Sequence, residues 1–195
     1  MLFLTIRIII VFKILLTANN LSCQIESRTL FEKVNLSITN QDRIALIGLN
    51  GSGKSTLLKM LAKDHSQSTV SKDPTSHLSG FVDLKSKTAY YKQTYPEESQ
   101  SILPIAEYLL QKDEPLDQVY TSYMRIWLQQ LDFEKIMKNL SGGELTKLMI
   151  AIEAAKKPEL FIMDEPTNNL DKDSIERLKE YIKYFQGGII FVSHN

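Results

Sequence analysis

The chain has 195 residues, of which 43% are hydrophobic and 24% charged, and its formal net charge is zero. This length suits one domain with room for a subdomain, and the composition is that of an ordinary globular protein. A neutral chain provides no bulk field that attracts nucleic acid or anionic lipid, so no direct sequence-specific DNA binding is expected. The one cysteine, Cys23, cannot form an internal disulfide and favours a reducing, cytoplasmic setting.

The first twelve residues form an apolar extension of uncertain role. Arg7 and Lys13 interrupt the apolar pattern, and the longest uninterrupted apolar run is five residues, 8–12. A membrane-spanning helix needs about 20 predominantly apolar residues. We therefore expect a strand that begins near Lys13, and a membrane role for the extension is the alternative.

Apolar runs and turn residues divide the rest of the chain into alternating strands and helices. Residues 64–79 are rich in Ser, Thr, Asp, Lys and Pro and predict a surface loop. The pattern predicts strands over residues 14–22, 34–38, 43–47, 80–82, 88–91, 160–163 and 189–192, and helices over 56–63, 105–111, 117–131, 141–157 and 173–185. Strands that alternate with helices in this way indicate a mostly parallel α/β sheet.

Residues 48–56 read G-x-x-x-x-G-K-S-T and lie between a predicted strand and a predicted helix. In such a loop, backbone N–H groups and the helix N-terminus form a cradle for phosphate. Lys54 would reach the β- and γ-phosphates of a nucleotide, and the Ser55 hydroxyl would ligate Mg²⁺. The candidate nucleotide-binding residues are Gly48, Asn50, Gly51, Ser52, Gly53, Lys54, Ser55 and Thr56.

Two adjacent carboxylates, Asp164 and Glu165, follow the apolar run 160–163. Nucleotide hydrolysis needs one carboxylate in the Mg²⁺ shell and another that orients and deprotonates water. We assign Asp164 to the metal and Glu165 to the general base.

Ser141 and Glu144 have the spacing of a helix capping box. A capping box does not account for Gly142 and Gly143, because glycine in a first turn costs about 1 kcal/mol relative to alanine. These two glycines predict that another backbone segment or a phosphate approaches the helix start closely.

Six motifs in this order resemble those of an ATP-binding cassette (ABC) nucleotide-binding domain. Residues 48–56 are similar to the Walker A loop, Gln93 to the Q-loop glutamine and residues 140–144 to the signature motif. Residues 160–165 are similar to Walker B, 170–171 to the D-loop, and His194 to the switch histidine.

The resemblance implies ATP and Mg²⁺ as ligands and assigns roles to several residues. Gln93 would sense the metal and the γ-phosphate, and His194 would position Glu165 and the attacking water. Ser141, Gly142 and Gly143 would serve the nucleotide of a second cassette, because two cassettes enclose two ATP molecules head to tail. Ile25 stands where an aromatic residue usually stacks on adenine, which indicates loose base selectivity.

The expected fold is therefore α/β, a P-loop NTPase (RecA-like) with a mostly parallel sheet core, an N-terminal antiparallel β part and an inserted helical subdomain. We expect a single ATPase domain over residues 13–195. Its core would cover about 13–93 and 158–195, and its helical subdomain about 94–157.

Two details favour the ABC-F branch, which acts on ribosomes. The signature ends in Glu144, and residues 166–171 are similar to that branch's P-T-N-H-L-D motif, with Asn169 in place of His. The expected function is a cytoplasmic ATPase, truncated after the switch histidine, that pairs with a second cassette and acts on translation. One alternative is the ATP-binding subunit of a membrane transporter, held peripherally by a permease, and another is a nucleotide-binding module with little turnover.

Overall fold

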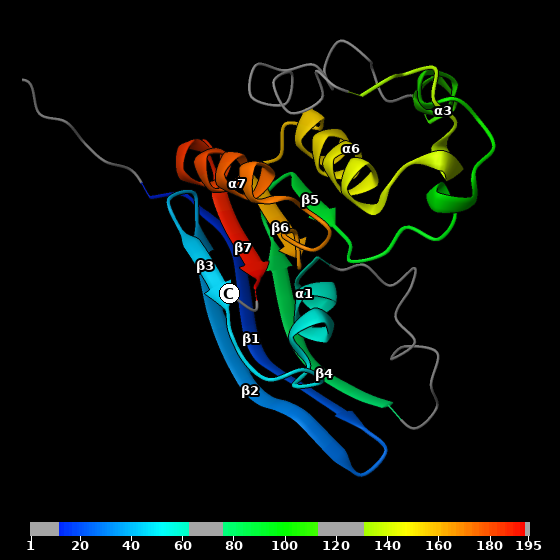
Figure 1. Cartoon of the computed structure of the whole chain (residues 1–195). Coiled ribbons are helices and arrows are strands. Elements are labelled where there is room, and N and C mark those ends of the chain that lie inside the picture. Colours follow the sequence, from blue (N-terminus) through cyan, green and yellow to red (C-terminus); the bar gives the residue numbers. More distant parts are fainter. Residues whose placement is uncertain (1–11, 63–75, 113–130, 194–195) are drawn as a thin grey trace, which may run out of the picture.

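The computed structural model describes residues 12–62, 76–112 and 131–193 as two sheets with helices between and beside them (Figure 1). One sheet is antiparallel and has the strand order β2-β1-β4, and the other is parallel and has the order β3-β7-β6-β5. The strands are β1 (Ile14–Ile25), β2 (Arg28–Thr39), β3 (Arg43–Leu46), β4 (Ser76–Leu84), β5 (Thr88–Tyr91), β6 (Leu160–Asp164) and β7 (Gly188–Val192).

The described helices follow the parallel strands or lie between β5 and β6. They are α1 (Lys54–Ala62), η1 (Glu98–Gln100), α3 (Ile105–Gln111), η2 (Met137–Asn139), α6 (Gly142–Ala155) and α7 (Lys172–Tyr184). A parallel core, an antiparallel N-terminal part and inserted helices are all present, so the predicted fold class is confirmed. Within the described ranges, every helix falls short of the length and apolar character needed to cross a bilayer.

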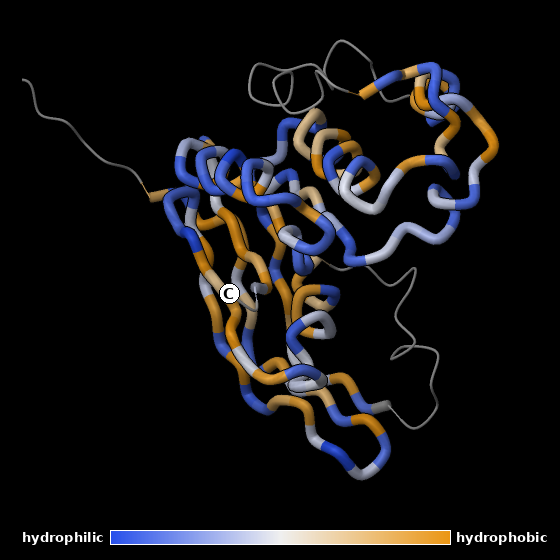
Figure 2. Tube along the Cα trace, in the orientation of Figure 1, coloured by the Kyte–Doolittle hydropathy of each residue, from blue (hydrophilic) through white to orange (hydrophobic). Residues whose placement is uncertain are grey.

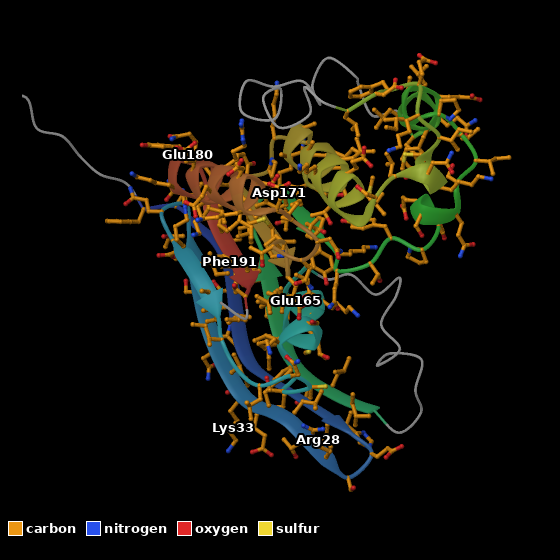
Figure 3. All side chains as sticks on the ribbon, viewed as in Figure 1. Arg28, Lys33, Glu165, Asp171, Glu180 and Phe191 are labelled. Carbon is orange, nitrogen blue, oxygen red and sulfur yellow. The ribbon has the colours of Figure 1, made fainter. Side chains whose placement is uncertain are left out.

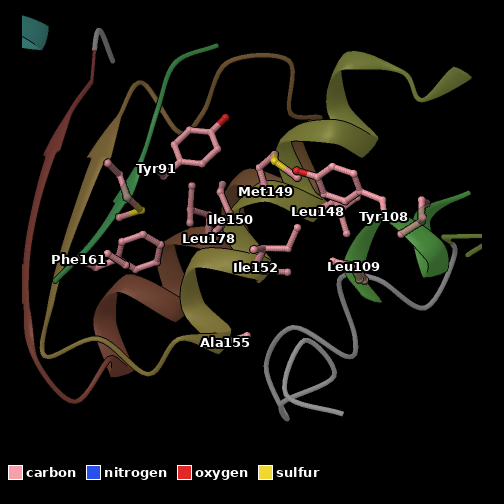
Figure 4. Packing of buried hydrophobic residues seen from close by; sticks show 14 of the residues in the cluster. Tyr91, Tyr108, Leu109, Leu148, Met149, Ile150, Ile152, Ala155, Phe161 and Leu178 are labelled. Atoms are coloured by element: carbon pink, nitrogen blue, oxygen red, sulfur yellow. The ribbon is translucent and has the colours of Figure 1, made fainter. Parts of the chain in front are cut away.

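The parallel sheet separates two hydrophobic cores because successive side chains of a strand point to opposite faces. On β6, Phe161 and Met163 pack with α6 and α7, on the side shown in Figure 4. Leu160 and Ile162 point the other way, toward β1 and α1. Every residue of β6 is buried, which explains why the sequence reads as a continuous apolar run rather than an alternating one.

The second core joins the two sheets through α1. Leu58 and Leu61 of α1 are fully buried in a cluster that also contains β1 residues such as Leu16 and β6 residues such as Ile162. In Figure 2 the two sheets carry most of the orange, whereas α7 is mainly blue and has only part of its surface against the sheet. The position of α1 is thus fixed by apolar packing with residues of both sheets, and so is the end of the glycine loop (residues 48–53) that leads into it.

Arg43 fixes the strand that leads into the glycine loop. Its guanidinium donates hydrogen bonds to the carbonyl oxygens of Ile182 at 2.6 Å, Gly187 at 2.5 Å and Phe185, where α7 ends. A planar guanidinium suits this role, because it offers several donors in a fixed geometry to carbonyls that the helix leaves unpaired.

The structure differs from the sequence-based prediction in the antiparallel sheet. The second strand begins at Arg28 rather than at residue 34, and β4 begins at Ser76, inside the predicted loop. Antiparallel pairing of β1 with β2 continues to Ile25 and Arg28. Each strand therefore supplies the backbone hydrogen bonds of the other there, although the side chains show no apolar pattern. The predicted helix 117–131, apart from Leu131, lies outside the described residues, as do residues 1–11 and His194.

Candidate functional site

The carboxyl ends of the parallel strands meet at one edge of the sheet. Leu46 at the end of β3 and Asp164 at the end of β6 both pair with Val192 at the end of β7. On β5, Tyr91 pairs with Met163, one residue before Asp164. The glycine loop, the carboxylate pair and the segment with Gln93 therefore leave the sheet together, at the edge where α/β proteins bind ligands.

A cavity of about 560 Å³ lies at this edge. Its wall contains the start of α1, the hairpin between β1 and β2, and the segments that follow β5 and β6. The lining residues are Ile25, Leu30, Asn50, Gly51, Gly53, Lys54, Ser55, Thr56, Gln93 and Glu165.

Hydrogen bonds from Lys54 stabilise the glycine loop. Lys54 Nζ donates hydrogen bonds to the carbonyl oxygens of Gly48 at 2.8 Å and Leu49 at 2.9 Å. Gly53 has a φ of 90°, and a Cβ at this position would lie 2.9 Å from the Cβ of Leu30. Only glycine combines this backbone conformation with so close an approach of the β2 strand, so the loop keeps its shape beside the ammonium group.

Ser55 and Asp164 bring two oxygen-bearing side chains together beneath the loop. The Ser55 hydroxyl donates to Asp164 Oδ1 at 2.9 Å, and Asp164 is 1% exposed. Burial raises the pKa of Asp164, while the Ser55 hydrogen bond opposes that shift. Mg²⁺ takes oxygen ligands and is bound in nucleotide sites through one or two protein groups together with phosphates. The donor set fits that ion, and the described residues contain no cluster of three or more His, Cys, Asp or Glu side chains that would form a site without a nucleotide.

Glu165 follows the buried strand β6 and lies beside α1 at the cavity (Figure 3). Its φ is 51°, a left-handed conformation that few residues other than glycine adopt. Glu165 Oε2 accepts hydrogen bonds from Gln93 Nε2 at 2.9 Å and from Asn168 Nδ2 at 2.5 Å. The structure thus brings Gln93 and Glu165 into direct contact, 72 residues apart in the chain.

Residues 140–144, the signature segment, form the capping box that the spacing of Ser141 and Glu144 predicted. Ser141 Oγ accepts from the Glu144 N–H at 3.2 Å, and Glu144 Oε2 accepts from the Ser141 N–H at 2.8 Å. The hydrogen bond from Lys135 and that from the Ser141 N–H together lower the pKa of Glu144 to about 2. Glu144 therefore stays ionised at neutral pH and holds the first turn of α6.

The two glycines of this segment make room for the loop after β6. A Cβ on Gly143 would lie 2.7 Å from the Asn169 carbonyl oxygen, and one on Gly142 would lie 3.2 Å from Asn169 Cγ. The close approach that the sequence predicted is therefore that of another backbone segment of the same chain. Gly142 and Asn169 also line a second cavity, of about 240 Å³, together with Tyr91, Gln93, Thr94, Tyr95, Pro96, Ser99, Leu145 and Thr146.

The larger cavity brings together most, but not all, of the predicted site residues. Asp164 and Gly48 are not part of the described wall, but each contacts a residue that is. Asp164 accepts a hydrogen bond from Ser55, and the Gly48 carbonyl oxygen accepts one from Lys54. Among the described residues, its wall does not include Ser52 or residues 141–143. His194, the predicted switch histidine, lies outside the described residues.

The sequence analysis did not identify three residues that contribute to the site. Leu30 lines the cavity beside Ile25, Arg28 donates to the Gly51 carbonyl oxygen at 3.1 Å, and Asn168 contacts Glu165. The first two lie on the β1–β2 hairpin, where Arg28 is labelled in Figure 3. Asn168 had a sequence signal, because it follows the carboxylate pair within the motif that resembles the ABC-F loop.

The parallel sheet and its glycine loop define the class of P-loop nucleoside triphosphatases. Within this class, the family model described as ABC transporter matches residues 31–168, and the chain belongs to that family. It is 33% identical, over 172 residues, to ABC transporter F family member 4 of Dictyostelium discoideum, which confirms the resemblance to the F branch. That match covers 86% of this chain and 14% of the relative.

A second relative is the ribosome protection protein VmlR of Bacillus subtilis (strain 168). It is 32% identical over 187 residues, which are 94% of this chain and 29% of VmlR. The chain therefore spans less than a third of the length of either relative. The solved structure named RNase-L Inhibitor matches with a TM-score of 0.73 at 21% identity, over 94% of this chain and 34% of that one, and supports the fold.

Proposed function

We propose that this chain is an ABC-F-type cassette that binds Mg-ATP and hydrolyses it to ADP and phosphate when paired head to tail with a second cassette. The observation that carries this proposal is the convergence of Lys54, Ser55, Gln93 and Glu165 on one cavity. Few other functions need a cation, a metal-ligating hydroxyl, an amide and a carboxylate at the end of a phosphate-binding loop.

The proposed chemistry divides among these residues. Lys54 and the loop N–H groups bind the phosphates and stabilise the negative charge that develops during transfer. Ser55 and Asp164 would hold Mg²⁺, which neutralises charge on the phosphate oxygens. Glu165 accepts the proton of the attacking water, and Gln93 donates a hydrogen bond to that carboxylate.

The position of the signature segment supports pairing with a second cassette. Ser141 and Gly142 are exposed, while residues 141–143 do not belong to the described wall of the larger cavity in their own chain. In the proposed pair, each signature segment completes the site of the other cassette. Hydrolysis by this chain alone would then require self-association.

We therefore expect the ATP turnover rate per chain to rise steeply with protein concentration, while Mg-ATP binding occurs at all concentrations. Turnover is measured by phosphate release over a concentration series, with light scattering to report the oligomeric state. Fast turnover that is independent of concentration in a monomeric preparation would contradict the pairing.

Ser141→Asp provides a test that leaves the helix cap in place. Asp caps a helix N-terminus as well as Ser does, but its charge would face the phosphates of the partner's nucleotide. We expect Ser141→Asp to abolish the concentration-dependent turnover and to leave Mg-ATP binding to the variant's own cavity unchanged. Ser141→Asn, which caps without a charge, is the matched comparison and should lose less turnover than Ser141→Asp, because it adds no charge beside the phosphates.

The base-binding end of the cavity predicts weak discrimination between ATP and GTP. Ile25 and Leu30 line the cavity with aliphatic side chains. A stacking contact worth about 1–3 kcal/mol is therefore missing, and we expect GTP to bind within about tenfold of ATP in competition calorimetry.

Ile25→Tyr should restore the preference for ATP by supplying a ring. Ile14→Tyr, at an exposed position of β1 outside the described wall of the cavity, is the control and should change neither affinity. A hundredfold preference for ATP in the unmodified chain would show that other residues recognise the base.

The ribosome is the proposed target. The F-branch relative and the name of VmlR support this choice, as do Glu144 and the similarity of residues 166–171 to the F-branch motif. Neutral net charge means that such binding would depend on local contacts rather than on a bulk field.

A membrane permease is the second candidate partner. The 240 Å³ cavity supports it, because Tyr91, Tyr95 and Pro96 give it apolar walls beside Gln93. A short helix of a permease inserted there would contact the same glutamine that donates to Glu165. In that case the cassette would be peripheral to a membrane.

A further inference from the structure

We propose that Asn168 is a positioning residue for Glu165, which it holds in place from the turn after β6. This proposal rests on the proposed function of Glu165 as the base. Asn168 does not line the larger cavity among the described residues, so it acts through Glu165 and not through the nucleotide.

The contact joins an amide donor to a carboxylate acceptor. Asn168 Nδ2 donates to Glu165 Oε2 at 2.5 Å, and the same oxygen accepts from Gln93 Nε2 at 2.9 Å. Hydrogen bonds to an ionised carboxylate are shorter and stronger than those between neutral groups. Two amide donors on one oxygen fix the orientation of the carboxyl group at the cavity wall.

The backbone places Asn168 for this role. The Asn168 N–H donates to the Glu165 carbonyl oxygen at 3.1 Å and closes a turn that begins at the left-handed Glu165. The two residues are therefore joined through both backbone and side chain, and the turn keeps the Asn168 side chain near the Glu165 carboxylate.

The same residue is tied to α6. The Asn168 carbonyl oxygen accepts from Thr146 Oγ1 at 3.4 Å, and Thr146 is buried in the second turn of α6. Lys147, the next residue of that helix, forms an ion pair with Asp171 at 3.2 Å. Asn168 thus joins the candidate base to the helix that carries the signature segment.

Asn168→Asp is the first test, because it keeps the shape of the side chain, removes the N–H donor and places a carboxylate against Glu165. We expect kcat for ATP to fall about tenfold, since small misplacements of a catalytic group have effects of this size, with KM for Mg-ATP changed less than twofold. The full chain is used at the protein concentration at which its turnover is highest.

Asn168→Ala removes the hydrogen bond to Glu165 without adding a negative charge, so it separates these two effects of Asn168→Asp. It should also reduce kcat, by about fivefold, because the carboxylate loses one of its two amide donors. If only Asn168→Asp reduces kcat, charge repulsion explains the effect and the positioning role is wrong.

Asn35→Asp is the matched control: Asn35 lies on β2, is exposed, and its Nδ2 donates to the Lys33 carbonyl oxygen at 2.8 Å. It should leave kcat unchanged.

A double variant tests the contact without any activity measurement. Asn168→Asp should lower the thermal midpoint by about 2–4 °C. In the double variant Glu165→Gln/Asn168→Asp, the new amide at position 165 can donate to the new carboxylate at 168, and the midpoint should recover by at least half. Equal shifts in the single and double variants would show that the two side chains do not interact and would overturn the proposal.

The two measurements distinguish this proposal from the proposed function. A recovered midpoint together with unchanged kcat in Asn168→Asp would establish the contact and refute its role in turnover. Absence of ATP turnover at any concentration of the unmodified chain would refute the proposed function and the role of Asn168 with it, while the midpoints still report the contact.

Discussion

Lys54→Ala should weaken Mg-ATP binding about 100-fold. Lys54 is the ammonium group in the cavity wall, and its Nζ lies within hydrogen-bonding distance of two carbonyl oxygens of the glycine loop. A hydrogen bond to a charged group contributes about 1.5–3 kcal/mol, and the upper value corresponds to about two orders of magnitude in Kd. Isothermal titration calorimetry of the full chain with Mg-ATP measures the change.

The control for this variant is Lys33→Ala, which removes the same charge from an exposed position on β2 (Figure 3). It should leave Kd unchanged. A thermal midpoint of Lys54→Ala close to that of the unmodified chain would show that the loss is local, because the two carbonyls of residues 48 and 49 can turn to solvent. Equal affinity in both variants would place the phosphates elsewhere.

The parallel core could be predicted from the sequence because its signals are local. Strand β6 is buried on both faces and reads as a continuous apolar run, and the glycine loop follows β3 and leads directly into α1. Asp164 is the last residue of β6 and Glu165 follows it, at the sheet edge where α/β proteins place ligand-binding groups. Each of these elements was predicted from a few consecutive residues, and the order of the elements along the chain predicted the fold class.

The antiparallel sheet was predicted less well because its strands are stabilised by each other. The first half of β2 is largely exposed and contains Glu32 and Lys33, and no periodic apolar pattern marks it as a strand. Pairing with β1 over Ile25 and Arg28 is a long-range property, which residue types on one strand do not encode. For the same reason, the approach of Leu30 to Gly53 and of Arg28 to Gly51 could not be read from the sequence.

The signature motif predicts glycines at positions 142 and 143 but does not say which contact requires them. The sequence indicated a close approach to the start of α6, by a phosphate or by backbone. The structure shows the Asn169 carbonyl oxygen 2.7 Å from where a Gly143 Cβ would lie. Packing within one chain is therefore sufficient to require glycine there, and the proposed contact with a partner's nucleotide must be tested separately, as with Ser141→Asp.

Glu165→Gln should reduce ATP turnover by about 10²- to 10⁴-fold, the usual contribution of a general base, while Mg-ATP binding is retained. The amide keeps the shape of the side chain, and its oxygen can still accept from Gln93 and Asn168, so the site should stay assembled. Because only proton acceptance is lost, bound ATP should persist and hold two cassettes together. Single-turnover phosphate release and light scattering with Mg-ATP measure both effects.

The same variant tests the proposed target, because a cassette pair locked by ATP should remain bound to whatever it acts on. We expect Glu165→Gln with Mg-ATP to co-sediment with ribosomes, and the unmodified chain to do so only weakly. Glu180→Gln makes the same change of charge on the exposed surface of α7 and is the control, which should behave like the unmodified chain. Recovery of the locked pair in the membrane fraction instead, dependent on the walls of the 240 Å³ cavity such as Tyr95, would favour a permease as the partner.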